Sequence, residues 1–249
     1  MSPSGSSSRP DPLLTVHAQL EVVTGLTRQT PALLVLDEFA GISRVDGAAG
    51  VLRTHLQPQY QALGLVFAGS EPSMMRSIFA EQHQPLYAQA DLVELGVLAP
   101  ADVAEVVADG FQATNRRAND LGFHIAAFTG GHPQRSMQVA DAAWRSVPRG
   151  GVADDTTWAA TLEDVRAASA NGLERLFSSL APRERDVLRI IAGGGSPFGA
   201  AAEPFGLSPG AAQHARGALL DAGHLHVVGG RLAVVDPVFA DWIRLRLPI

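Results

Sequence analysis

The stretch Leu33-Leu34-Val35-Leu36-Asp37-Glu38-Phe39 decides the fold of this chain: an apolar run that ends in two adjacent carboxylates. Such a run predicts a buried strand of a parallel sheet, because both faces of a parallel sheet are normally covered. Asp37 and Glu38 follow at the carboxyl end of the strand, where open α/β sheets bind their ligands. The pair therefore predicts a ligand site, although solvated residues at an ordinary strand-to-loop junction would give the same pattern.

A second stretch, Gly64-Leu65-Val66-Phe67-Ala68-Gly69-Ser70, is again an apolar strand that ends in small polar residues. The helices that we expect around these two strands cover residues 13–27, 47–60 and 73–79, and a short third strand is expected at 91–95. Strands that alternate with helices predict a parallel, three-layer α/β sheet. Ser70, at the tip of the second strand, is then a candidate ligand-binding residue, with a helix cap or a turn residue as the alternative.

After Pro100 the pattern becomes helical. Helices are expected at 101–117, 119–128, 133–147, 183–192, 208–222 and 237–247, and at 156–180 with a break near Asn171-Gly172. Strands at 225–228 and 231–235, joined by Gly229-Gly230, predict a hairpin. Helices followed by a hairpin have the order of a winged helix. We therefore expect a disordered leader (1–12), a partial core (13–100), a helical lid (101–150), a linker helix (151–170) and a winged helix (171–249).

The composition excludes several kinds of chemistry. The 249 residues include no cysteine and no lysine, so disulfides, thiolate metal sites, cysteine nucleophiles and lysine Schiff bases are ruled out. The eight histidines show no metal-ligand spacing, and no Gly-x-Ser-x-Gly elbow is present. Residues 1–12 lack the apolar core of a signal peptide, and no apolar stretch is long enough to span a bilayer. We expect a cytoplasmic protein without a membrane partner.

Three further motifs carry a family resemblance. They are Gly69-Ser70-Glu71-Pro72-Ser73-Met74-Met75, Gln84-Pro85-Leu86-Tyr87 and Thr129-Gly130-Gly131-His132-Pro133. Together with the strand at 33–39 they resemble the archaeal-type ATPase family, a branch of the AAA+/STAND group of P-loop ATPases. The resemblance runs from about Leu13 to Val147, and the C-terminal unit also fits. One departure is that the family has Gly-Arg after Pro-Leu-Tyr, where this chain has Ala88-Gln89.

The resemblance implies a role for five residues. Asp37 would hold Mg²⁺ as the Walker B aspartate, and Glu38 would be the catalytic residue that polarises the attacking water. Ser70 would sense the γ-phosphate of ATP. Pro133 would lie against the adenine, although a proline that merely starts a helix explains it as well. Arg135 resembles a sensor-2 arginine that reaches the γ-phosphate from the lid, with a solvent-facing helix arginine as the alternative.

The other half of a nucleotide site is missing from this sequence. A phosphate-binding loop ends in Gly-Lys-Ser/Thr, and all 19 basic residues here are arginines. We therefore expect an ATPase fragment truncated before its phosphate loop, a nucleotide-dependent switch that needs ATP and Mg²⁺ only in a complete form. The rival hypothesis is a non-enzymatic winged-helix regulator on a degenerate ATPase scaffold. Residues 171–249 hold eight arginines and seven acidic residues, a balance that favours docking to protein over DNA.

Overall fold

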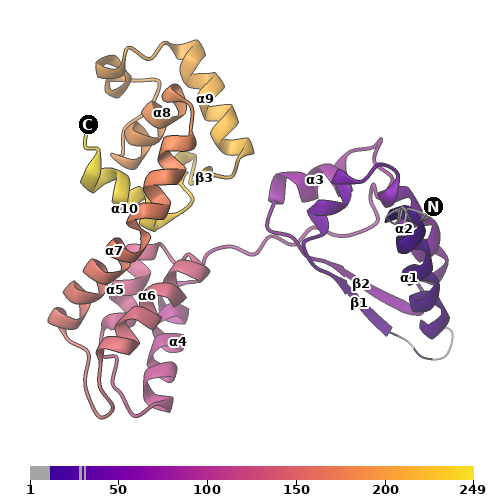
Figure 1. The fold of residues 1–249 in the computed structure, drawn as a ribbon, viewed down its shortest axis with the longest axis horizontal. Coiled ribbons are helices and arrows are strands. Elements are labelled where there is room, and N and C mark those ends of the chain that lie inside the picture. Colours follow the sequence, from indigo (N-terminus) through magenta and orange to yellow (C-terminus); the bar gives the residue numbers. More distant parts are fainter. Residues whose placement is uncertain (1–11, 28–29, 31) are drawn as a thin grey trace, which may run out of the picture. The chain divides into compact units, whose positions relative to one another are not determined.

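The structure is a computed structural model that describes residues 12–27, 30 and 32–249. The expected leader lies outside these residues, apart from Pro12. The chain divides into two compact units, the first ending at Glu94 and the second running from Leu95 to Ile249 (Figure 1). The proposed domain limits at 100, 150 and 170 stay predictions.

The first unit is built on two parallel strands, β1 (Ala32–Leu36) and β2 (Leu63–Phe67). Both strands were predicted and are confirmed. Their register pairs Leu33 with Gly64 and Leu36 with Phe67, so the two strands end at the same edge. Two further bonds extend the pairing past this edge: Ala68 N–H donates to Leu36 O, and Phe39 N–H donates to Ala68 O, both at 2.9 Å.

The first unit also contains helices and short 3₁₀ turns. They are α1 (Pro12–Thr27), η1 (Phe39–Arg44), α2 (Ala48–Leu56), η2 (Gln57–Gln59) and α3 (Pro72–Ala80). The core of the unit gathers around three phenylalanine rings, Phe39, Phe67 and Phe79, whose centroids lie 4.5 to 5.8 Å apart. Phe39, directly after the carboxylate pair, is thus buried in the core and holds the end of β1 in place.

The predicted third strand is wrong. Residues 91–99 have no regular secondary structure, and Val93 and Leu95 are 81% and 93% exposed. The sequence has the alternating apolar pattern of a strand, but a strand exists only where a neighbour supplies its backbone hydrogen bonds. No described strand of the first unit lies beside this segment.

The second unit is helical apart from one hairpin. Its elements are α4 (Pro100–Ala113), α5 (Leu121–Thr129), α6 (Pro133–Ser146), α7 (Asp155–Ser179), α8 (Pro182–Ala192), η3 (Ala200–Phe205), α9 (Pro209–Asp221), β3 (Leu225–Val228), β4 (Arg231–Val234) and α10 (Pro237–Arg246). The hairpin is confirmed, and Gly229 and Gly230 both take the positive φ that its turn requires. The assignment of this region as a winged helix stays a prediction.

The predicted break at Asn171-Gly172 is wrong, because α7 runs through both residues without interruption. A glycine inside a helix costs about 1 kcal/mol relative to alanine. Packing just beyond it offsets that cost: Leu173 is buried, and the Phe177 ring contacts Trp242 at 5.6 Å between centroids. Tertiary contacts therefore override the local preference.

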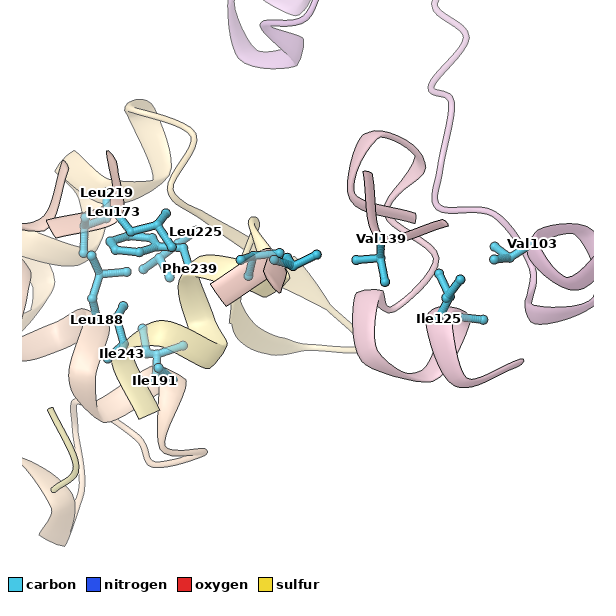
Figure 2. Packing of buried hydrophobic residues seen from close by; sticks show 14 of the residues in the cluster. Val103, Ile125, Val139, Leu173, Leu188, Ile191, Leu219, Leu225, Phe239 and Ile243 are labelled. Carbon is cyan, nitrogen blue, oxygen red and sulfur yellow. The ribbon is translucent and has the colours of Figure 1, made fainter. Parts of the chain in front are cut away.

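One apolar cluster runs through the second unit (Figure 2). It joins Val103, Ile125 and Val139 of α4–α6 to Leu188 of α8 and Phe239 of α10. The chain is therefore mostly helical, with a parallel sheet smaller than the three-layer architecture that the sequence predicted. Among the described residues, none of the helices combines the length and the apolar character needed to cross a membrane.

Candidate functional site

The tips of β1 and β2 bring three of the five candidate residues to one place. Asp37 and Glu38 follow β1, Ser70 follows β2 by three residues, and the Ser70 Oγ donates a hydrogen bond to Glu38 Oε2 at 3.3 Å. This contact joins residues 32 positions apart. It arises because the carboxyl ends of parallel strands meet at the same edge, which is where ligands of open α/β sheets bind.

Glu38 has an unusual backbone. Its φ of 49° lies in the left-handed region, which costs a residue with a Cβ about 1–3 kcal/mol when the surroundings enforce it. Its N–H donates to Asp37 Oδ1 at 2.9 Å, and buried Phe39 follows directly. The turn therefore points the two carboxylates away from the core while the phenylalanine fixes their position.

The surroundings of Ser70 exclude one of the alternatives for this residue. The residue before α3 is Glu71, so Ser70 is not the helix cap that the sequence left open. Glu71 instead forms an exposed ion pair with Arg44, with 3.6 Å between Arg44 Nη2 and Glu71 Oε1. Sequence analysis did not select Glu71 or Arg44, and only the folded chain brings Arg44 to Glu71.

The described part of the chain places no positive partner on Asp37 or Glu38. Among the ion pairs of the described residues, none includes Asp37 or Glu38. No group of three or more potential ligands in that part of the chain is arranged to hold a metal ion. Two oxygen donors nevertheless suit Mg²⁺, which binds through one or two carboxylates while water and phosphate oxygens complete its octahedron.

The two remaining candidates lie in the second unit. Pro133 is the first residue of α6, after His132 as N-cap, which confirms its role as a helix-starting proline. Arg135 donates from Nε to Asp236 Oδ1 at 2.9 Å and forms a second bond to Oδ2. Its side chain is only 20% exposed, so the alternative of a solvent-facing arginine is wrong. Sequence analysis missed Asp236, which lies 101 positions away.

Asp236 has a second task beside Arg135. Its Oδ1 also accepts hydrogen bonds from the N–H groups of Val238 and Phe239, and so caps α10. Asp241, farther along α10, pairs with Arg166 of α7, whose Nε lies 2.8 Å from Oδ2. The hydrogen bonds that Arg166 donates to Asp241 raise the pKa of Arg166. Arg135 of α6 thus pairs with Asp236 at the N-cap of α10, and Arg166 of α7 pairs with Asp241 within α10.

The position where the sequence departs from its resembled family is also structured. Ala88 has a φ of 54°, a conformation that favours glycine, and its N–H donates to Phe79 O at 2.9 Å. Gln89 Oε1 accepts a hydrogen bond from the Tyr60 hydroxyl at 3.0 Å. Burial raises the pKa of Tyr60, partly opposed by Arg53. In this chain Ala88 and Gln89 bond to Phe79 and Tyr60 of the same unit, and neither residue is an arginine.

No family model matches the sequence, and no curated protein does. Among solved structures, the chain is similar to a Walker-type ATPase of Pyrococcus abyssi, with a TM-score of 0.69 and 16% sequence identity. The match covers 95% of this chain and 72% of that chain. The chain therefore shares its fold with a Walker-type ATPase.

Proposed function

We propose that the chain is a nucleotide-binding, ATPase-like protein in which the tips of β1 and β2 form the metal and γ-phosphate side of a Mg²⁺–ATP site. One observation carries the proposal: Ser70 is bonded to Glu38, beside Asp37, at the carboxyl edge of a parallel sheet. Acidic and hydroxyl groups at that edge are what a Mg²⁺-bound phosphate requires. The fold similarity supports the same class.

Each side chain has a separate task in this proposal. Asp37 would bind the hydrated Mg²⁺ ion. Glu38 would orient and polarise the water that attacks the γ-phosphate, with Ser70 holding its carboxylate through the observed bond. Pro133 and Arg135 keep their predicted contacts with adenine and γ-phosphate as part of the proposal. Arg135 could serve a phosphate only by leaving Asp236.

The sequence also limits what this chain does alone. A phosphate loop holds the β- and γ-phosphates by backbone N–H groups and one lysine, and the chain has no lysine. We therefore expect a Kd for Mg²⁺–ATP of roughly millimolar or weaker and no hydrolysis. The finer assignment, a nucleotide-dependent switch of the AAA+/STAND type, belongs to a form with a complete site.

The test is a titration of the ¹⁵N-labelled chain with ATP, with and without Mg²⁺, followed by amide chemical shifts. We expect Mg²⁺-dependent shifts at residues 36–39 and 68–71, lost in Asp37→Asn and retained in Asp46→Asn. Asp46 is the matched control because it is an exposed carboxylate in the same unit. Shifts that do not depend on Asp37, or micromolar affinity without a lysine, would contradict the proposal.

For the C-terminal region we propose a winged helix that docks to protein. His214 and Arg216 of α9 and Arg231 at the hairpin turn are its few polar contacts for DNA. Few phosphate contacts mean a shallow salt dependence and affinity near the non-specific range of about 10⁻⁴–10⁻⁶ M. Salt-resistant nanomolar binding of the full chain to one DNA sequence, lost in Arg216→Ala, would favour the DNA-binding regulator instead.

A further inference from the structure

A cleft lies between α7 and α10 in the second unit. Its volume is about 470 Å³, which falls in the range of roughly 300–1,000 Å³ typical of small-molecule sites. Ala167 and Ala170 line it from α7, and Trp242 and Leu245 line it from α10. The two residues of each pair are three positions apart, so each helix contributes one face to the cleft. None of the five candidate residues of the nucleotide site lines it.

The walls of the cleft are apolar and fixed by the core. Leu173 and Val238 also line it, and both are buried members of the apolar cluster of the second unit. The Trp242 ring stacks on buried Phe239 with 6.2 Å between centroids, which holds the indole in place. Leu245 is 58% exposed, so its side chain offers apolar surface that the described chain leaves uncovered. A ligand with an apolar body would bury this surface, which is favourable in proportion to the area removed from water.

Three charged residues, Glu163, Arg166 and Arg246, also line the cleft. Arg166 is already occupied, because its Nε and Nη2 donate to the two carboxylate oxygens of Asp241 at 2.8 and 3.2 Å. Glu163 and Arg246 are exposed, and no ion pair of the described residues includes either of them. The cleft therefore presents one carboxylate and one guanidinium to a ligand, beside apolar walls.

We propose that the α7–α10 cleft binds a small zwitterionic ligand with an apolar body, of the size of a short apolar peptide. The carboxylate of the ligand pairs with Arg246, its ammonium group pairs with Glu163, and its apolar body covers Trp242 and Leu245. Charge complementarity carries this choice: an apolar acid or an apolar amine uses one of the two charged groups and leaves the other unpaired, whereas a zwitterion uses both. The inference does not depend on the proposed nucleotide site.

The tripeptide Leu-Ala-Leu with free termini is the probe, titrated into the ¹⁵N-labelled full chain. We expect saturable amide shifts at residues 159–173 and 238–246. Ala167→Leu, which fills the cleft, should weaken binding at least 10-fold. Ala168→Leu is the matched control and should leave the Kd unchanged, because Ala168 is the neighbouring exposed alanine and does not line the cleft. Leucine is a good helix former, so both variants keep α7. Absence of saturable shifts, or an equal loss of binding in both variants, would overturn the inference.

Peptides with one blocked end test the two charges separately. Acetylation removes the ammonium group and should weaken binding about 3-fold or more, the scale of a partly exposed ion pair. Glu163→Gln should weaken binding of the free peptide by the same factor and leave binding of the acetylated peptide unchanged, because the pair is already lost. Amidation of the carboxyl end and Arg246→Gln should be linked in the same way.

Asp164→Asn and Arg175→Gln are the matched charge controls, since both residues are exposed on α7 and neither lines the cleft. Both variants should bind the free peptide like the unmodified protein. Tighter binding of the acetylated peptide than of the free peptide would overturn the inference, because the cleft would then select an apolar acid. Binding that depends on Ala167 but on neither Glu163 nor Arg246 would also overturn it, because the cleft would then select apolar surface alone.

Discussion

The two units of the chain differ in how completely they bury their apolar surface. In the second unit, α4–α10 share one cluster, and the aspartates of α10 are paired with arginines from α6 and α7. In the first unit the core lies on one side of a two-stranded sheet, and the other side exposes Leu33, Val35 and Val66. The second unit ties Asp236 and Asp241 to arginines of other helices, whereas in the first unit Asp37 and Glu38 take part in no ion pair of the described residues. Incomplete packing and the candidate site therefore occur in the same part of the molecule.

The largest expected effect is a loss of stability in the second unit. Phe239 is 1% exposed and contacts the rings of Phe177 and Trp242, so Phe239→Ala should lower the free energy of unfolding of the second unit by about 3–5 kcal/mol. Val35→Thr should change the stability of the first unit by no more than about 0.5 kcal/mol, because the valine is exposed. Amide hydrogen exchange measures both units in one experiment. Loss of protection in β1 and β2 on Phe239→Ala would contradict the separation of the two units.

The second prediction concerns Glu38 and Asp37 of the first unit, in a form of the protein that hydrolyses ATP. Glu38→Gln should preserve nucleotide binding and slow turnover about 10²-fold or more, the scale of a lost general base. Asp37→Ala should instead weaken the Mg²⁺-dependent part of binding, because a metal contact is removed. Steady-state kinetics together with binding titrations distinguish the two variants. Equal turnover in Glu38→Gln and the unmodified protein would show that this carboxylate does not activate water.

A smaller effect is expected where Asp236 joins α6 to α10. Asp236→Ala removes both the Arg135 pair and the α10 cap, and should cost about 1–3 kcal/mol, since the pair is partly exposed and screened. Asp236→Asn retains an oxygen that can cap the helix and should cost less. Urea unfolding of both Asp236 variants and of Arg135→Ala measures how much the Arg135–Asp236 pair contributes to the free energy of unfolding. If both Asp236 variants had the same free energy of unfolding as the unmodified protein, Arg135 could leave Asp236 for another ligand at no cost in stability.

The smallest effect is a pH dependence at the start of α7. Hydrogen bonds from the Thr156 hydroxyl and from the N–H and hydroxyl of Thr157 lower the pKa of the Asp154 carboxyl to about 2. Because the folded-state pKa is depressed, the stabilisation is present above the ordinary value near 4 and is lost as the pH falls through about 2. The Thr157 amide shift should therefore titrate in that window. Titration near the ordinary value would show that the cap is not formed.

The sequence revealed local features well and long-range partners poorly. The apolar runs of β1 and β2 and the Gly229-Gly230 turn were predictable, because each depends on residues close together in the chain. Residues 91–95 were predicted as a strand because their pattern is that of a strand, and no pattern shows whether a neighbour exists. In the candidate site, the bond between Ser70 and Glu38 could be expected from parallel strands. The partner of Arg135 could not, since nothing local identifies Asp236.

The most direct test of the central claim uses Mn²⁺ as a paramagnetic substitute for Mg²⁺. Substoichiometric Mn²⁺ added to the ¹⁵N-labelled chain with excess ATP broadens amide signals close to the bound metal. The account predicts selective broadening at residues 36–39 and 68–71, at the tips of β1 and β2, which disappears in Asp37→Asn and persists in Asp46→Asn. Uniform broadening over all exposed acidic residues, or broadening unaffected by Asp37→Asn, would contradict a metal–nucleotide site at this edge.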